Sequence, residues 1–326
     1  MSDDAVTDPP VPEAAPPKRA RVVVVGSANT DMTARVARLP QPGETVLGTG
    51  FESLPGGKGA NQAVAAARLG AVVTFIACVG TDGLGDALVL GLEAEGINTR
   101  YVVRDPDAPT GVALITVDEA TGENVIVVAS GANAKLSVGV VEMARDAIRD
   151  ADILVCQLES PLETVRAALK LAREAGKMTV LNPAPAQALP DDLLALVSVL
   201  TPNETEAALL AGDAQADPQA AAAALHARGA GQIVVTLGAS GVLLSSADSA
   251  KPIPGRSAAQ VVDTTAAGDC FTGALAVALG EGKPLDAAAA FANAAAALSV
   301  TKAGAQPSLP NRYEVEELLT GGVPRG

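Results

Sequence analysis

The 326-residue sequence contains no tryptophan, and aromatic residues make up only 2% of it. Proteins that hold single-stranded nucleic acid commonly stack its bases on aromatic side chains, so this composition argues against that function. The formal net charge of −14 argues against nucleic acid more generally, because the protein would repel a phosphate backbone. We therefore expect no nucleic-acid partner.

Histidine and cysteine are also scarce. The single histidine, His226, argues against a zinc site built on histidines. The three cysteines, Cys78, Cys156 and Cys270, are far apart in the sequence and form no CxxC motif. We expect them to be reduced, packed thiols, as is typical of a cytoplasmic protein.

Long apolar runs are missing as well. No run approaches the roughly 20 apolar residues that a membrane-spanning helix needs, so we expect no membrane partner. Residues 1–20 carry five prolines, several acidic residues and no apolar periodicity. This composition is unlike a signal peptide and predicts a disordered tail on a cytoplasmic protein.

Hydrophobic residues nevertheless make up 48% of the chain, enough for a large core. The stretch RVVVVGSANTD begins with β-branched residues and ends in glycine and polar residues. It is typical of a buried parallel strand whose carboxyl end opens onto a loop. Further apolar runs, such as 72–80, alternate with helical patterns, such as 59–69 and 267–280. The sequence predicts an α/β fold: a doubly wound, mainly parallel sheet flanked by helices.

Two segments, 32–54 and 110–129, interrupt this alternation with strand-like patterns that no helix separates. The second contains the turn signal DEATGEN between two apolar runs, which predicts a hairpin. We expect both segments to form a small discontinuous β-sheet that acts as a lid over a core of residues 21–31, 55–109 and 130–320. Its exposed strands would also form a homodimer interface, and a β-extension used only for dimerisation is the alternative.

Polar residues follow nearly every predicted strand. Open α/β sheets bind ligands at the carboxyl ends of their strands, so these residues predict a polar site there. They are Asn29, Asp31, Glu159, Asn182, Asn203, Glu206, Thr236, Gly238, Asp263 and Asp269.

The glycine-rich segment SLPGGKGANQAV, residues 53–64, precedes a helical pattern. It does not match a P-loop, because Lys58 is followed by Gly59 rather than by serine or threonine. What remains is a backbone that a ligand can approach closely, with Lys58 and Asn61 as polar groups. This combination suits a hydroxyl-rich ligand, although a plain glycine turn entering a helix remains possible.

The stretch VDTTAAGDCFTGAL, from Val262, places an acid at the start of a predicted helix. The backbone N–H groups of Ala266, Ala267 and Gly268 would lie in the first turn, where a helix offers them no carbonyl partner. Together with the helix dipole they would form an anion hole. Asp269 beside it could take a proton from an attacking hydroxyl, whereas a simple helix cap is the alternative.

Six segments carry a resemblance to a known family. They are, in order, GSANTD, PGGKGANQAVAAARLG, NPAPA, TPNETEA, TLGASGV and DTTAAGDCFTGAL. The sequence resembles the ribokinase-like carbohydrate kinases from about residue 22 to about residue 319. The resemblance implies ATP-dependent phosphorylation of a sugar, specifically the 5-hydroxyl of D-ribose. It also implies Mg²⁺ and K⁺ as cofactors.

The resemblance also implies roles for individual residues. Asp269 would be the catalytic base, with Ala266, Ala267 and Gly268 as its anion hole. The implied sugar-binding residues are Asn29, Thr30, Asp31, Gly57, Lys58, Gly59, Ala60, Asn61, Glu159 and Asp269. The implied nucleotide-binding residues are Asn203, Thr236, Leu237, Gly238, Ala239, Ser240, Gly241, Gly268 and Asn293. Glu206 would lie near Mg²⁺, and the implied K⁺ residues are Asp263, Thr265, Ser299, Lys302, Gly304 and Ser308.

Other functions remain compatible with the sequence. A sister kinase that acts on fructose, ketodeoxygluconate or a nucleoside would share the anion hole and differ around Asn29, Asp31 and Asn61. A non-catalytic sugar-binding protein and a nucleoside hydrolase are also open. A dinucleotide-binding oxidoreductase is disfavoured, because Gly26-Ser27-Ala28-Asn29 does not match the GxGxxG fingerprint.

Overall fold

The computed structural model describes residues 18–258 and 260–321. Of the predicted disordered tail, residues 1–17 lie outside the described residues. Residues 18–20 already contact the core: the ammonium of Lys18 lies 2.6 Å from a carboxylate oxygen of Asp152, and Ala20 is buried. Within the described part of the chain, no helix combines the length and apolarity needed to cross a membrane.

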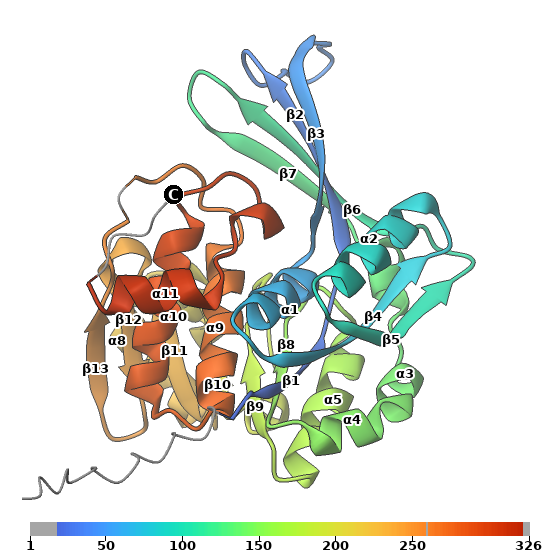
Figure 1. Ribbon diagram of the computed structural model, residues 1–326. Helices are drawn as coiled ribbons and strands as arrows, with labels where there is room; N and C mark the ends of the chain where they lie inside the picture. The colour runs from blue at the N-terminus through green and yellow to red at the C-terminus, as the bar shows by residue number, and fades with distance from the viewer. Residues whose placement is uncertain (1–17, 259, 322–326) are drawn as a thin grey trace, which may run out of the picture.

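Nine of the described strands form one large sheet (Figure 1). Their spatial order is β13 (Ala250–Pro254), β12 (Gly241–Ser245), β11 (Gln232–Thr236), β10 (Val199–Leu200), β9 (Met178–Leu181), β8 (Ile153–Cys156), β1 (Arg21–Val25), β4 (Val72–Gly80) and β5 (Asn98–Asp105). All neighbouring pairs from β11 to β5 are parallel, whereas β12 and β13 pair antiparallel at one edge. The predicted mainly parallel sheet is confirmed; its antiparallel edge was not predicted.

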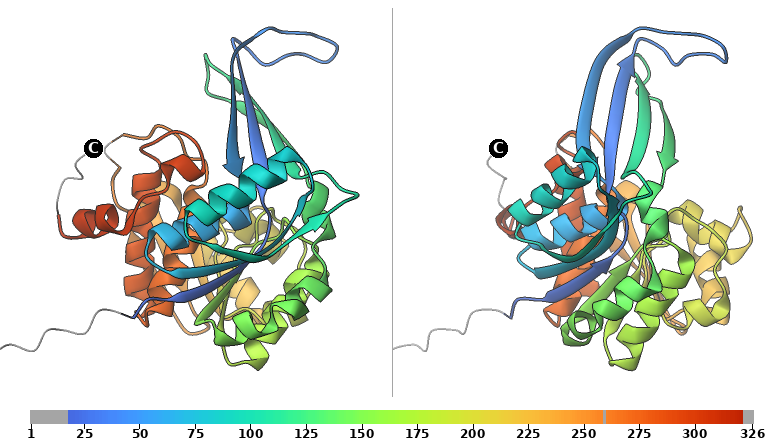
Figure 2. Two further views of the ribbon diagram at one scale, coloured as in Figure 1. Left: turned by 45° about the vertical axis from the view of Figure 1, so that its right-hand side comes forward. Right: turned by 90° about the vertical axis from the view of Figure 1, so that its right-hand side faces the viewer.

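Helices cover both faces of the large sheet (Figure 2). The strands alternate accordingly: in β1, Val22 and Val24 join one buried cluster, while Val23 and Val25 join the other. On the first face lie α1 (Lys58–Arg68), α2 (Gly83–Ala94), α9 (Ala267–Gly280), α10 (Leu285–Ser299) and α11 (Arg312–Leu319). On the second lie α3 (Val138–Met143), α4 (Arg145–Asp150), α5 (Leu162–Glu174), α6 (Asp191–Leu194), α7 (Glu204–Ala211) and α8 (Pro218–Ala227). The doubly wound fold is confirmed.

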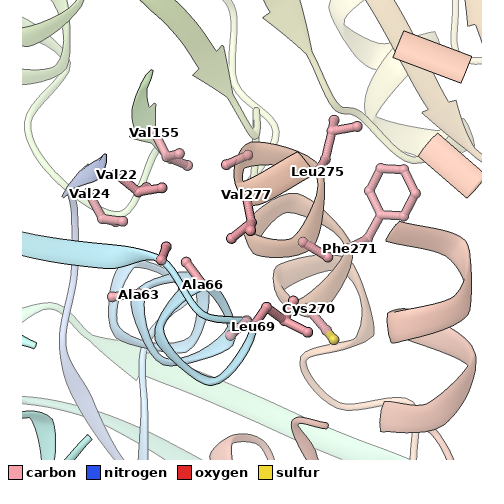
Figure 3. Close-up of a cluster of buried hydrophobic side chains, with 14 of the residues drawn as sticks. Val22, Val24, Ala63, Ala66, Leu69, Val155, Cys270, Phe271, Leu275 and Val277 are labelled. Atoms are coloured by element: carbon pink, nitrogen blue, oxygen red, sulfur yellow. The ribbon is translucent and has the colours of Figure 1, made fainter. Parts of the chain in front are cut away.

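Helices α1 and α9 pack closely against each other over the strands (Figure 3). Small residues allow this approach: a Cβ atom added to Gly273 of α9 would lie 2.7 Å from the carbonyl oxygen of Gln62 and 2.8 Å from the Cβ of Ala65. Both helices begin at the carboxyl edge of the sheet, α1 after Gly57 and α9 after Ala266. The contact therefore fixes the two helix starts relative to each other.

A second, smaller sheet contains β3 (Gly48–Gly56), β2 (Asn29–Val36), β6 (Gly111–Asp118) and β7 (Asn124–Ala129), in that spatial order. It projects away from the large sheet in every view (Figures 1 and 2). Strands β6 and β7 form an antiparallel hairpin, and β2 pairs antiparallel with β3 and parallel with β6. The expected small discontinuous sheet is thus present, and β2 already begins at Asn29 rather than at residue 32. Short 3₁₀ helices lie at Gly131–Lys135 (η1), Gly238–Ser240 (η2) and Gln306–Ser308 (η3).

We predict that Gly273→Ala lowers the free energy of unfolding by about 1–3 kcal/mol, because its methyl group would push α9 away from α1. The matched control is Gly91→Ala in α2, where an added Cβ would meet nothing within 4 Å. That control should raise stability by roughly 0.5–1 kcal/mol through helix propensity alone. Urea denaturation of both variants measures the difference, and equal effects would contradict the close packing of α1 on α9.

Candidate active site

Three adjoining cavities run along the carboxyl edge of the large sheet. The first measures about 650 Å³ and lies where the small sheet meets the large one; the second measures about 220 Å³ and the third about 520 Å³. Lys58, Ala266 and Asp269 line both the first and the second cavity. Thr236, Thr264, Ala267 and Gly268 line both the second and the third. The cavities therefore form one continuous site with Asp269 at a junction.

The wall of the first cavity is divided between polar and apolar residues. Its polar part comes from the large sheet and the start of β2, and comprises Asn29, Asp31, Lys58, Asn61, Glu159 and Asp269 together with the backbone of Gly57. The β6–β7 hairpin contributes Ala113, Ile115, Ile126 and Val128 to its apolar part, and Leu158, Pro161, Leu162 and Pro185 from outside the hairpin also line it. Thr30, Gly59 and Ala60, which the resemblance placed at the sugar, are buried behind this wall.

Backbone contacts at the start of α1 position several of these polar groups. Gly57 has φ +88°, and a Cβ atom there would lie 2.6 Å from the backbone nitrogen of Asn29, so only glycine fits. Glu159 accepts a hydrogen bond from the backbone N–H of Lys58 at 3.0 Å. The side chain of Asn29 is held from behind, because Nδ2 of Asn133 in η1 donates to its Oδ1 at 2.7 Å.

Asp269 is the most buried carboxylate of the site and lies in the first turn of α9. Nδ2 of Asn61 donates to its Oδ2 at 2.9 Å, and Nε2 of Gln62 donates to its Oδ1 at 3.0 Å. Burial raises the pKa of Asp269, and the ammonium of Lys58 and these two amides act in the opposite direction. Asp269 in turn is the main cause of the raised pKa of Lys58. Both residues line the first and the second cavity, so each acts on the charge of the other at their junction.

The start of α9 differs in one detail from the expected anion hole. The N–H of Ala267 donates to the carbonyl of Thr264 at 3.2 Å, so this group is not free as we expected. Ala266 is the N-cap and, among the described residues, the one non-glycine with positive φ, 60°. A Cβ atom at Gly268 would meet nothing within 4 Å. The backbone of Gly268 therefore faces the open second and third cavities and has no helical carbonyl partner.

The second cavity is lined by the amide of Asn203 and the carboxylate of Glu206 as well as by Lys58. Asn203 and Glu206 line it and form a capping box at the start of α7: Asn203 Oδ1 accepts from the Glu206 N–H at 2.8 Å, and Glu206 Oε2 accepts from the Asn203 N–H at 2.8 Å. Burial raises the pKa of Glu206. Asn203, Glu206 and Asp269 thus line the same cavity, as expected of polar residues that follow predicted strands.

The third cavity is lined mainly by backbone and small side chains. Thr236 ends β11, Gly238, Ala239 and Gly241 come after it, and Asn293 of α10 lines the same cavity. The two predicted neighbours Leu237 and Ser240 do not line the cavity. Nδ2 of Asn293 donates to the Pro254 carbonyl at 3.4 Å, which places this amide at the cavity wall.

The loops of the implied K⁺ site meet at Asp263. Its carboxylate accepts the Thr265 N–H at 2.9 Å and the Gly304 N–H at 2.8 Å. Burial would raise the pKa of Asp263, but these hydrogen bonds outweigh it and the pKa is lowered. The other side chains point elsewhere: Lys302 pairs with Glu314 at 2.9 Å, and the hydroxyls of Ser299 and Ser308 donate to the carbonyls of Ala296 and Ala305.

Comparison with known proteins identifies the family. The model of the pfkB family carbohydrate kinases matches residues 19–312 of the chain. The chain belongs to this family. The pfkB family is the same one that the sequence motifs indicated, so that resemblance is confirmed.

Individual pfkB kinases are similar to the chain over almost their whole length. Ribokinase from Haemophilus influenzae is 46% identical over 304 residues, which cover 92% of this chain and 99% of that protein. The crystal structure of ribokinase from Thermotoga maritima has a TM-score of 0.85 at 39% identity and covers 92% of this chain and 99% of its own. The structure of Arabidopsis thaliana ribokinase complexed with ribose and ATP has a TM-score of 0.85 at 35% identity and covers 93% and 99%.

Sequence reasoning missed several residues of this pfkB site. Asn133 holds Asn29, Gln62 holds Asp269, and the apolar wall of the first cavity comes from Ile115, Ile126 and Val128. Gln62 carries a signal that could have been noticed, because it is an amide inside an otherwise alanine-rich, buried helix. Buried polar side chains need hydrogen-bond partners. A buried amide such as Gln62 therefore indicates that other polar side chains lie around it.

Asp31 supplies a test of the site's electrostatics. Burial, together with the nearby Glu159 and Asp269, raises its pKa from 3.8 to about 7. The folded protein therefore binds an extra proton between these two values, and its stability falls as pH rises through this range. We predict that Asp31→Asn raises the Tm by roughly 2–4 °C at pH 8 and has its smallest effect near pH 4.

Thermal unfolding followed by circular dichroism at pH 4, 6 and 8 measures this difference. The control is Asp248→Asn, because Asp248 is an exposed carboxylate outside the site. A Tm gain for Asp31→Asn that is the same at all three pH values would contradict the raised pKa.

Proposed function

We propose that the chain transfers the terminal phosphoryl group of ATP to the 5-hydroxyl of D-ribose, giving ribose 5-phosphate and ADP. The observation that carries this proposal is the place of Asp269, a buried carboxylate between one cavity lined by hydroxyl-binding groups and another that faces a helix start. The similarity to ribokinases, one of them solved with ribose and ATP, supports ribose as the sugar.

Ribose would occupy the first cavity. Asn29, Asp31, Lys58 and Glu159 offer donors and acceptors for its hydroxyls. The Oδ1 atom of Asn61 is buried and has no hydrogen-bond partner among the described residues. Because an unpaired buried acceptor is costly, a sugar hydroxyl that donates to Asn61 would satisfy it. The apolar hairpin wall would cover the carbon face of the sugar.

Phosphoryl transfer itself demands positioning and charge stabilisation more than covalent chemistry. Asp269 would take the proton of the 5-hydroxyl as that oxygen attacks phosphorus. The backbone N–H of Gly268 and the positive end of the α9 dipole would face the charge that develops on the transferring group. Lys58, which lines both cavities, would add a positive charge beside it.

The nucleotide would occupy the third cavity, with its adenine among the small residues after β11 and near Asn293. The second cavity offers hard oxygen donors from Asn203 and Glu206, and oxygen donors of this kind suit Mg²⁺. When bound with ATP, Mg²⁺ neutralises charge on the phosphates. Asn203 and Glu206 are the residues that would hold it.

The small sheet would act as a lid and as a dimer interface. The face of β6 and β7 opposite the cavity presents Leu114, Val125 and Val127, which are 49%, 52% and 57% exposed, and Met32 is paired with Leu114 across the sheet. An apolar face of this kind needs cover, and a second copy of the sheet would supply it. Analytical ultracentrifugation of the wild type and of Val127→Asp tests this, and an unchanged molecular mass would count against it.

The function itself is tested by coupled ADP release with Mg-ATP and K⁺ in the presence of ribose, deoxyribose, fructose, ketodeoxygluconate or adenosine. We expect clear preference for ribose. Preference for another sugar would be compatible with Asp269 as the base. It would contradict the proposal that the polar residues of the first cavity bind ribose. Sugar binding without turnover of any compound would indicate a non-catalytic sugar-binding protein.

We predict that Asp269→Asn lowers phosphoryl transfer by roughly 10²–10⁴-fold, the contribution that is typical of a general base. Its binding of ribose and of ATP should stay within a few-fold of the wild type, because the amide keeps the shape of the carboxylate. Calorimetric titration and the coupled assay measure the two effects. A variant that retains substantial turnover would exclude Asp269 as the base.

We also predict faster turnover in K⁺ than in Na⁺. Asp263 joins the two loops that the resemblance assigned to a monovalent cation, because its carboxylate accepts the N–H groups of Thr265 and Gly304 close to the start of α9. A cation bound there would add positive charge beside the anion site. Rates measured in the two chloride salts at equal ionic strength give the comparison, and equal rates would remove the cation from the proposal.

A further inference from the structure

Gln62 is completely buried on α1 and lines none of the three cavities. Its Nε2 nevertheless donates to Oδ1 of Asp269 at 3.0 Å and lies 3.2 Å from Oδ1 of Asn182. Its Oε1 accepts a hydrogen bond from Nε2 of Gln157 at 2.6 Å. The side chain thus contacts the candidate base from within the protein, without lining any of the three cavities.

The charge of Asp269 determines which end of each amide group in this network donates a hydrogen bond and which end accepts one. An ionised carboxylate only accepts hydrogen bonds, so Gln62 must present its NH₂ group to Asp269. Its Oε1 then faces Gln157, which must donate in turn. The Oε1 of Gln157 has no partner among the described residues and packs against Gly26, where any added Cβ would collide with it. An unsatisfied buried acceptor is costly, so in this orientation the unpaired atom lies at the Gln157 end of the network and both oxygens of Asp269 are satisfied.

The two oxygens of Asp269 therefore have different surroundings. Asn61, which holds Oδ2, lines the first cavity, whereas Gln62, which holds Oδ1, lies behind it. We propose that Gln62 is a positioning residue for phosphoryl transfer, which anchors Oδ1 of Asp269 so that Oδ2 is the oxygen presented to the sugar hydroxyl. This inference rests on the proposed function.

Gln62 also favours the ionised form of the base. The charged groups around Asp269 come from four elements: Lys58 of α1 favours the ionised carboxylate, while Asp31 of β2, Glu159 after β8 and Glu206 of α7 oppose it. Burial opposes it as well. The hydrogen bond that Gln62 donates to Oδ1 favours the ionised carboxylate and so offsets part of these opposing effects. Removal of this hydrogen bond would therefore raise the pKa of Asp269.

The test is Gln62→Met, which keeps the length of the side chain and removes its hydrogen bonds. Single-turnover phosphoryl transfer to ribose is followed from pH 5 to pH 9 by quenched flow. We expect the acidic limb of the pH–rate profile to move up by about 1 unit, and the rate at pH 7 to fall by roughly 10–100-fold. The Kd of ribose, from calorimetry, should stay within about threefold because Gln62 lines no cavity.

Thr272→Val is the matched control. Thr272 is buried one turn after Asp269 on α9 and bonds Thr201 at 3.2 Å rather than the carboxylate. Thr272→Val should leave the acidic limb of the pH–rate profile at its wild-type position, even if the variant has a lower free energy of unfolding. Gln62→Glu is a second variant of preserved shape, for use if the methionine variant does not fold; its carboxylate beside Asp269 should move the limb further upward.

An acidic limb that stays at its wild-type position in the folded Gln62 variants would overturn the inference, as would a loss of ribose binding as large as the loss of rate. Both results leave the proposed function intact, because the wild-type enzyme still phosphorylates ribose. If the wild type itself transfers no phosphoryl group to any sugar, the proposed function fails and the inference fails with it.

Discussion

The carboxylate of Asp269 is buried at the start of α9, and two amides of α1 hold it there. A buried charge is tolerated only where partners satisfy it, so the site depends on the exact approach of α1 to α9. Gly273 permits that approach at the point where a larger residue would meet the carbonyl of Gln62. The packing of two helices made largely of small residues therefore decides where the charge lies.

This constraint gives the unusual composition a physical meaning. Alanine and glycine are frequent in α1 and α9, and small side chains bring backbones closer than aromatic ones would. Figure 3 shows Ala63 and Ala66 of α1 among the larger apolar side chains of the strands and of α9. In the first cavity, the small sheet supplies the bulky apolar residues Ile115 and Ile126, and Leu158 and Leu162 add to them. Polar groups such as Lys58 and Glu159 thus share a cavity with an apolar wall that comes partly from a separate element.

Much of the fold and of the site could be predicted because each signal was local. The alternation of strands and helices, the glycine segment before α1 and the acid at the start of α9 all depend on neighbouring residues. The antiparallel strands β12 and β13 and the contacts of Asn133 and Gln62 were missed, because they depend on distant segments meeting. The same limit explains Ala267, whose N–H is taken by Thr264, and Lys302, whose side chain turns to Glu314.

A crystal structure with ribose and a non-hydrolysable ATP analogue would show whether Asp269 and the start of α9 lie on either side of the reacting atoms. We predict that the 5-hydroxyl oxygen lies roughly 3 Å from Oδ2 of Asp269, with the terminal phosphate facing the backbone of Gly268. Ribose bound in the first cavity with its 5-hydroxyl turned away from Asp269, or a phosphate chain far from the start of α9, would contradict it.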